Sequence, residues 1–569
     1  MHHTVSMVVA ASTVGALVTA CARQPTPPAS IVLQNAHVWT GDSTVPRAQA
    51  VALRDSVIVF VGDDSGAARF IGPTTRVIDA RGALVMPGFI DSHVHPVSGG
   101  RELAQCDLND VPTLDSLKAV VRACAARTPA GQWITGGGYA QPLFVGGRPT
   151  AQLLDALAPD HPASLSSSDG HTAWVNSRAL AAAGITRATP DPDGGRIDRD
   201  ARGAPSGTLR ERAIRLVSQH IPPTTDAQLD DGLSRALARA ARLGLTTLYE
   251  ASAGESFLAA YARADSAGTL TARIVASLQT SPVQGPEQVA RLAALRATYT
   301  RRLVQPIAAK IFADGVLEAG TAAVLEPYVG TPSDRGILEF GPQALTALVH
   351  ALDSAGFKVH VHAIGDRGIR VALDAFEAQH RRDGGAGPRH QVVHLQLIDP
   401  VDIPRFARLG VVASFQALWH QRDGYIVDLT EPRLGAGRSA RLYPMRSVAN
   451  TGAIIAGGSD WSVTSLDPLQ AIEVGITRRA VGDTVAPAWI PAEAMTLDQM
   501  LRAYTRGGAY AIDRERELGV LRAGALADVI VLSEDLFTLP PHRIHRARVV
   551  HTIMHGREVW HDSAGPRAR

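Results

Sequence analysis

Short apolar runs alternate with amphipathic stretches along most of the chain. Eight of these runs have the length and the β-branched content of buried strands: residues 89–93, 246–250, 272–277, 308–312, 358–362, 391–394, 411–415 and 453–456. Helical patterns, such as 344–355 and 368–380, separate most of them. The alternation predicts an α/β fold with a parallel sheet, and eight strands are what a TIM-type (β/α)8 barrel needs. A doubly wound open sheet is the alternative.

The two ends of the chain have the texture of an antiparallel sheet. Short β runs separated by Gly-Asp turns fill residues 31–85, and similar runs return at 527–532 and 549–556. The interval between the first two barrel strands is far longer than an ordinary connection. We therefore predict a small composite β domain (31–85 and 515–562), a barrel (86–104 and 226–514) and a cap subdomain inserted after barrel strand 1 (105–225).

Composition narrows the class of partner. The chain has 569 residues, of which 45% are hydrophobic and 19% charged, as expected for a globular protein with a sizeable core. Its 56 Lys and Arg residues nearly balance 54 Asp and Glu residues, so it has no basic field for nucleic acid. We expect a small-molecule substrate, and a homodimer is an open prediction.

The N-terminal residues predict export. Residues 5–20 form an apolar run that is shorter than the roughly 20 residues of a membrane span, which indicates a signal peptide (1–21) and a linker (22–30). The end of the run, Leu-Val-Thr-Ala-Cys, resembles a bacterial lipoprotein signal. This implies lipidation of Cys21 and a lipid anchor in the cell envelope, at the periplasm or outer membrane. The first four residues lack Lys and Arg, so cleaved secretory and cytoplasmic forms stay open.

Two further cysteines, Cys106 and Cys124, remain. An exported protein can pair them, but spacing alone does not establish the geometry of a disulfide. We expect two small buried thiols.

A His-x-His pair stands at the end of the first predicted strand. His93 and His95 are two residues apart, so on an extended chain both side chains point to one side and can share a cation. Four more polar residues fall at or near the ends of later strands: Lys310, His362, His394 and Asp460. Because these ends converge on one mouth of a barrel, and because imidazoles and a carboxylate suit Zn²⁺ or a related divalent ion, we predict a metal site there.

Some of these assignments have alternatives. An ammonium cannot bind a metal, so Lys310 is either an ordinary ion-paired lysine or a carbamate formed with CO2, which is an anionic ligand. His360 and His390 have the same strand parity as His362 and His394 and are competing ligands or core imidazoles. We favour His362 over His360.

The motifs as they stand resemble those of a known family. Residues 86–95, Met-Pro-Gly-Phe-Ile-Asp-Ser-His-Val-His, resemble the first-strand signature of the amidohydrolase superfamily, and the chain resembles its YtcJ-like branch, amidohydrolase family 3. Supporting matches in chain order are 169–176 (DGHTAWVN), 310–315 (KIFADG), 362–366 (HAIGD), His394, 413–416 (ASFQ), 458–460 (GSD) and 527–530 (ADVI).

The resemblance implies a metal-dependent hydrolase with one or two divalent ions, zinc by expectation. His93 and His95 would hold the more buried ion, His362 and His394 the second, and a carboxylated Lys310 would bridge them. A single ion held by His93, His95, Asp460 and another His is the alternative. Asp460 would take the proton of the attacking water and return it to the leaving nitrogen, as general base and then general acid.

The expected reaction is hydrolysis of a non-peptide C–N bond, of the amide, N-acyl or formamide type, in a small molecule. His171 is expected to act in catalysis, and Gln416, Asp314 and Trp174 to contact substrate. Local structural roles are their alternatives. Two other functions stay open: a barrel isomerase or lyase that uses the same metal site, and a non-catalytic surface lipoprotein with a vestigial site.

Overall fold

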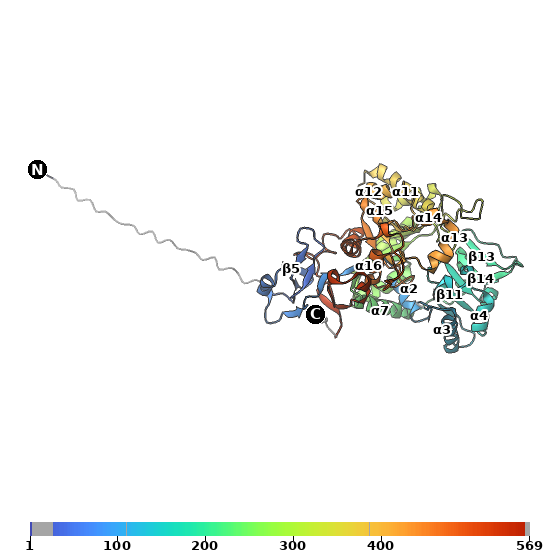
Figure 1. The fold of residues 1–569 in the computed structure, drawn as a ribbon, viewed down its shortest axis with the longest axis horizontal. Coiled ribbons are helices and arrows are strands. Elements are labelled where there is room, and N and C mark those ends of the chain that lie inside the picture. Colours follow the sequence, from blue (N-terminus) through green and yellow to red (C-terminus); the bar gives the residue numbers. More distant parts are fainter. Residues whose placement is uncertain (3–26, 110, 386, 564–569) are drawn as a thin grey trace.

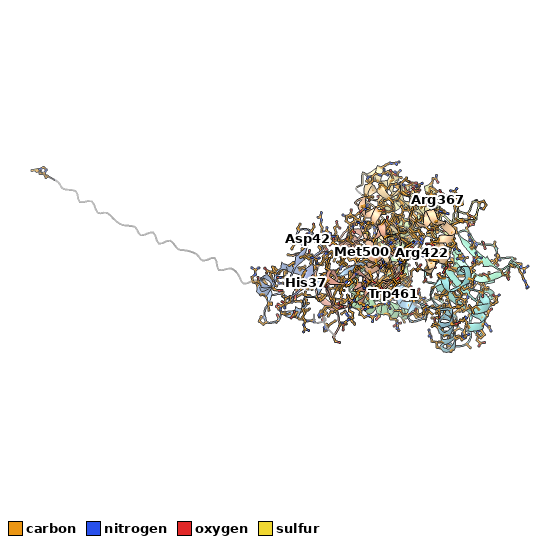
Figure 2. All side chains as sticks on the ribbon, viewed as in Figure 1. His37, Asp42, Arg367, Arg422, Trp461 and Met500 are labelled. Atoms are coloured by element: carbon orange, nitrogen blue, oxygen red, sulfur yellow. A yellow bond between two sulfur atoms is a disulfide. The ribbon has the colours of Figure 1, made fainter. Side chains whose placement is uncertain are left out.

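The computed structural model describes residues 1–2, 27–109, 111–385 and 387–563. The predicted export signal, Cys21 and most of the linker lie outside these residues. Within them, no helix combines the length and the apolar character that crossing a bilayer requires. Figure 1 shows three parts in a row: a β domain at the end where the described chain starts, a central barrel, and the insert on the opposite side.

The centre is an eight-stranded parallel sheet that curls into a nearly closed barrel, which confirms the predicted fold class. Neighbours follow chain order, from β8 to β21. The seam between these two strands is bridged where Ser92 Oγ donates to the carbonyl of Gly457 at 2.8 Å. The strands are β8 (Phe89–Val94), β15 (Leu245–Ala253), β16 (Arg273–Gln279), β17 (Val304–Phe312), β18 (Lys358–Ala363), β19 (Gln391–His394), β20 (Val412–Phe415) and β21 (Ile455–Gly457).

Amphipathic helices cover the outside of the barrel. The helix α7 (Asp226–Arg242) begins with a capping box formed by Thr225 and Gln228 and buries one apolar face in the same core as the strands. Other helices of this layer are α8 (Glu255–Ser266), α9 (Gln288–Tyr299), α10 (Pro342–Ser354), α11 (Asp366–Asp383), α12 (Ile403–Leu409), α15 (Met445–Asn450) and α16 (Pro468–Thr477).

Strands from both ends of the chain share one sheet. β7 (Leu84–Pro87) pairs antiparallel with β22 (Val529–Leu532), which continues to β23 (Val549–Met554) and β24 (Arg557–His561). A second sheet is built from β1 (Ile31–Gln34), β4 (Ala50–Arg54), β5 (Val57–Gly62) and β6 (Arg76–Asp79). The two sheets share an apolar core.

A buried ion pair shows which end of the barrel this β domain covers. Asp528, just before β22, pairs with Arg273, the first residue of β16. The β domain therefore sits at the N-terminal ends of the barrel strands, away from the mouth.

The insert forms a six-stranded mixed sheet at the opposite end. The sheet order is β13 (Gly195–Arg199), β14 (Pro205–Glu211), β12 (Thr172–Val175), β11 (Ala163–Ser167), β10 (Ile134–Tyr139) and β9 (Cys106–Asp107). α3 (Leu114–Arg127), α4 (Ala151–Leu157) and α5 (Ser177–Ala182) pack on it. Glu211 of β14 accepts a hydrogen bond at 2.6 Å from Thr321 in the loop after β17. This contact places the insert against the C-terminal mouth of the barrel.

The expectation of two free thiols is wrong. Cys106 on β9 and Cys124 on α3 form a disulfide, with their Cα atoms 5.7 Å apart. The error has a simple cause: α3 lies against the edge strand β9, and only this packing brings residues 18 positions apart within bridging distance.

Candidate metal centre

The first-strand motif is folded so that its polar residues hold the mouth together. Asp91 Oδ1 accepts hydrogen bonds from the backbone N–H groups of His93 (3.1 Å) and Ser459 (3.0 Å), which ties β8 to the loop after β21. Burial raises the pKa of Asp91 to about 7. A Cβ atom at Gly458 would lie 2.8 Å from the backbone nitrogen of His93, so this close approach requires glycine.

Three donors from three different strand ends meet at this mouth. Ligand atoms of His93, His394 and Asp460 all lie within 4.8 Å of one another, and all three residues are buried. Asp460 Oδ1 is 3.3 Å from His93 Nε2 and 3.2 Å from His95 Nε2, while Asp460 Oδ2 is 3.8 Å from His394 Nδ1. Imidazole nitrogens and a carboxylate oxygen at these separations are a donor set that Zn²⁺ and related ions accept.

Two of the donors sit on unusual backbone. His394 has φ +80° and Asp460 has φ +53°, a region that residues other than glycine seldom adopt. Such conformations cost free energy and persist where the surrounding structure dictates them, often at functional sites. Here they turn the two side chains inward at the points where β19 and β21 end.

The charge states suit a cation. Burial and the nearby Lys310 lower the pKa of His93 to about 3, so its imidazole is neutral and offers a lone pair. Burial alone would raise the pKa of Asp460, but His93, His95 and His394 hold it well below its ordinary value. Burial opposes protonation of His95 as well, yet Asp460 and Glu250 raise its pKa to about 9. A bound cation would displace that proton.

A second layer of side chains orients the donors. His360 Nε2 is 2.7 Å from His93 Nδ1, and its own Nδ1 is 2.8 Å from Ser277 Oγ. Both ring nitrogens of His360 are therefore engaged below the cluster, which supports His362 as the residue at the mouth. His390 lies apart, with Nδ1 accepting from Val359 N–H at 3.1 Å.

The sequence interpretation missed Glu250. This fully buried carboxylate on the second barrel strand, β15, lies 3.5 Å from His95 Nδ1. Tyr261 Oη and the Ser252 N–H donate to it at 2.6 and 2.9 Å. A carboxylate on the far nitrogen of a ligating histidine fixes its tautomer and ring orientation. The available signal was its position as the last residue of the predicted run 246–250, the strand that follows the His-x-His strand.

Lys310 and His362 reach the same cavity but not the tight cluster. Burial lowers the pKa of Lys310 to about 7, and its Nζ lies 4.7 Å from the centre of the Phe312 ring. The His362 ring centre is 4.5 Å from that of His394, and its Nε2 is 3.1 Å from the carbonyl oxygen of Gly315. The geometry thus groups His93, His394 and Asp460, and leaves Lys310 and His362 elsewhere on the cavity wall.

A cavity of about 660 Å³ opens above the cluster. This is the size range of small-molecule sites. The insert contributes His171, whose ring centre lies 5.2 Å from that of His362. His171 Nδ1 is 2.8 Å from Glu211 Oε2, which leaves Nε2 for the cavity. Burial alone would lower the pKa of His171, but Glu211 raises it to about 9.

Two of the predicted substrate contacts, Trp174 and Gln416, do not border the cavity. Trp174 is fully buried in the core of the insert, against Tyr139 and Phe144, and its Nε1 donates to the Thr150 carbonyl at 2.8 Å. Gln416 lies behind His394, with Oε1 2.9 Å from His394 Nδ1, so it is placed to orient that ring.

Asp314, the third predicted contact, borders the cavity, but its oxygens are occupied. They accept from the backbone N–H groups of Ala323 (2.9 Å), Ile364 (3.0 Å) and Gly365 (2.9 Å). Burial raises its pKa to about 7. Asp314 therefore joins the loops after β17 and β18 next to His362.

A barrel with histidines from two strand ends and an aspartate from a third gathered at its C-terminal mouth is the architecture of a metal-dependent hydrolase. The family model described as "Amidohydrolase family" matches residues 76–560. The chain therefore belongs to the amidohydrolase family, which confirms the resemblance drawn from the motifs.

Individual relatives agree. "Protein LONG AFTER FAR-RED 3" of Arabidopsis thaliana is 32% identical over 523 residues, which cover 89% of this chain and 88% of that protein. "Putative amidohydrolase YtcJ" of Bacillus subtilis (strain 168) is 31% identical over 91% of this chain and 97% of that protein. "N-substituted formamide deformylase" of Arthrobacter pascens is 27% identical over 92% of this chain and 97% of that protein.

Among solved structures, an uncharacterized metal-dependent hydrolase from Pyrococcus furiosus superposes with a TM-score of 0.67. It is 27% identical and is matched over 88% of this chain and 98% of that chain. Family, fold and donor cluster together support hydrolase activity that depends on a metal ion.

Proposed function

We propose that this protein hydrolyses a non-peptide C–N bond of a small molecule, of the N-substituted formamide, N-acyl or related amide type. The observation that carries the proposal is the cluster of His93, His394 and Asp460 at the floor of the 660 Å³ cavity, with His171 above it. The relative named for formamide deformylation supports this choice of bond.

We propose one zinc ion, held by His93, His95, His394 and Asp460. When bound, such an ion supplies an acidified water and polarises a carbonyl. A second ion would use His362 and would require Lys310 as a carbamate, so metal analysis distinguishes one equivalent per chain from two.

Asp460 and His171 supply the proton transfer and the stabilisation of the carbonyl oxygen. Asp460 is ionised and borders three imidazoles, so it is placed to accept the proton of the attacking water and to deliver it to the leaving nitrogen. His171, protonated and oriented by Glu211, is placed to donate a hydrogen bond to the carbonyl oxygen as negative charge develops there. The buried surroundings strengthen both interactions.

We also propose that the protein is exported and lipid-anchored through Cys21. The disulfide between Cys106 and Cys124 supports an oxidising compartment. Labelling with a radioactive fatty acid in a bacterial host, compared with Cys21→Ser, tests the anchor. Label that persists in Cys21→Ser would refute it.

Product analysis in oxygen-18 water tests the reaction. Zinc-loaded protein is incubated with N-substituted formamides, N-acyl amino acids, lactams and hydantoins. We expect an acid that carries one solvent oxygen, together with an amine, and no product from Asp460→Asn. An isomerase would yield a product of unchanged composition, and a lyase would incorporate no solvent oxygen. A vestigial site would bind no metal and form no product.

A further inference from the structure

One wall of the cavity holds two carboxylates that form no ion pair with any described residue. Glu318, in the loop after β17, borders the cavity and is only 9% exposed. Its Oε1 accepts from Gln396 Nε2 at 2.8 Å and from Thr430 Oγ1 at 3.1 Å, both neutral donors. Asp423, in the loop after β20, borders the cavity as well, and its Oδ1 accepts from the Ile426 N–H at 3.1 Å.

Two other carboxylates that border the cavity have cationic partners, whereas Glu102 and Asp169 have none within 4.0 Å among the described residues. Glu211 pairs with His171, and Glu339 pairs with Arg212. Among the described residues, neither Glu318 nor Asp423 lies within 4.0 Å of a Lys, Arg or His nitrogen. An ionised carboxylate in such a setting is costly unless a cation approaches it.

Tyr443 provides an independent sign that a ligand belongs here. It borders the cavity, is 2% exposed, and its ring stacks on His420 at 4.7 Å. Its backbone N–H donates to the Gln396 carbonyl at 2.8 Å, which joins it to the wall of Glu318. Within the part of the chain that the structure describes, no protein group hydrogen-bonds its hydroxyl, which keeps access to the cavity and can accept from a ligand there.

We propose that Glu318, Asp423 and Tyr443 form a subsite for a primary ammonium group on the substrate. An ammonium has three N–H donors and no acceptor, and the wall offers acceptors on three separate side chains. A guanidinium is a poorer match, because its two parallel N–H groups prefer to bind both oxygens of one carboxylate. Oε1 of Glu318 already accepts from two donors.

The subsite and the donor cluster border the same cavity. Gln396, which holds Glu318, is two residues after His394. A substrate anchored here by its ammonium therefore extends along the cavity toward the cluster. This inference rests on the proposed function for the identity of the bond that reacts. The ammonium subsite adds the substrate class: amides and formamides that carry a second, protonated amine.

Binding of inert probes tests the subsite without turnover. The probes are an ω-amino methyl ketone and the methyl ketone of equal length in which a methyl group replaces the ammonium; neither has a C–N bond to hydrolyse at the carbonyl. Titration calorimetry with the zinc-loaded protein at neutral pH is expected to give about 10- to 100-fold tighter binding of the amino ketone, the value of hydrogen bonds to a charged group.

Glu318→Gln is expected to reduce this preference to about threefold or less, and Tyr443→Phe to weaken it by about two- to fivefold. Glu326→Gln is the matched control, because it removes an exposed carboxylate from the same loop; it should keep the wild-type preference. Thermal unfolding checks each variant. Equal binding of both ketones by the wild type overturns the subsite whatever the variants do, as does an unchanged preference in folded Glu318→Gln.

Kinetics separates this inference from the proposed function. With the monoformamide of a linear diamine and the alkyl formamide of equal length, hydrolysis of both at equal kcat/KM would overturn the subsite and leave the hydrolase intact. If the protein prefers the amino ketone but hydrolyses no amide, the proposed hydrolysis is overturned and the ammonium subsite stands.

Discussion

Replacing Glu250 with Gln is expected to weaken zinc binding while leaving the fold in place. Glu250 is fully buried, and its carboxylate lies 3.5 Å from His95 Nδ1. The substitution keeps the volume and an oxygen that can accept from Tyr261, but it removes the charge that fixes the His95 ring. The expected defect is therefore one of metal affinity, because His95 no longer presents Nε2 in a single orientation.

The distance between Glu250 and His95 sets the expected loss of zinc affinity. Loss of a carboxylate behind a ligating histidine typically lowers metal affinity about 10- to 100-fold, which corresponds to about 1.4–2.8 kcal/mol. The separation of 3.5 Å is long for a hydrogen bond, so the lower part of this range applies. We expect a zinc Kd about tenfold higher than that of the wild type.

Competition with a chromophoric zinc chelator measures the Kd directly. Glu473→Gln is the matched control: Glu473 is equally buried and is 2.7 Å from a histidine nitrogen, on His545, but it does not border the cavity. Both variants are checked by thermal unfolding. Wild-type zinc affinity in Glu250→Gln, or an equal loss in Glu473→Gln, would refute the positioning role.

Three further predictions concern the insert. His171→Asn should lower kcat/KM about 100-fold at unchanged zinc content. Because His171 loses its proton as the pH rises through its pKa of about 9, wild-type activity should fall above that pH. In Glu211→Gln this fall should begin at a lower pH. Full activity of His171→Asn would contradict this role. Trp174→Phe should lower the Tm but leave KM unchanged, and a changed KM would place it at the substrate after all. Cys106→Ser should destabilise the insert by about 3 kcal/mol, since the disulfide with Cys124 spans 18 positions; identical melting with and without reductant would contradict this.

The barrel was predictable because its strands are buried on both faces and read as short apolar runs. Residues 358–362 and 391–394, for example, correspond closely to β18 (Lys358–Ala363) and β19 (Gln391–His394). The gathering of His93, His394 and Asp460 was predictable for a related reason: strand ends converge at one mouth, so polar residues there come together whatever their separation in sequence.

The sequence does not determine a side chain's direction where that direction depends on tertiary packing. For Trp174, a substrate contact and a packing role were both open, and the structure buries every residue of β12 inside the insert. Gln416 directly follows barrel strand β20, as a site residue would, but its amide oxygen contacts His394. Strand parity could not separate His360 from His362, since depth along the barrel axis decides which ring reaches the mouth.

The most direct test of the metal-dependent hydrolase is the dependence of turnover on added zinc. Protein stripped with a chelator is titrated with zinc while hydrolysis of an N-substituted formamide, or of the best substrate from the amide panel, is followed. We predict no turnover without zinc and a linear rise to a plateau at one equivalent per chain, with His93→Ala inactive at that level. Full turnover by the stripped protein, or by His93→Ala at one equivalent, would contradict the assignment.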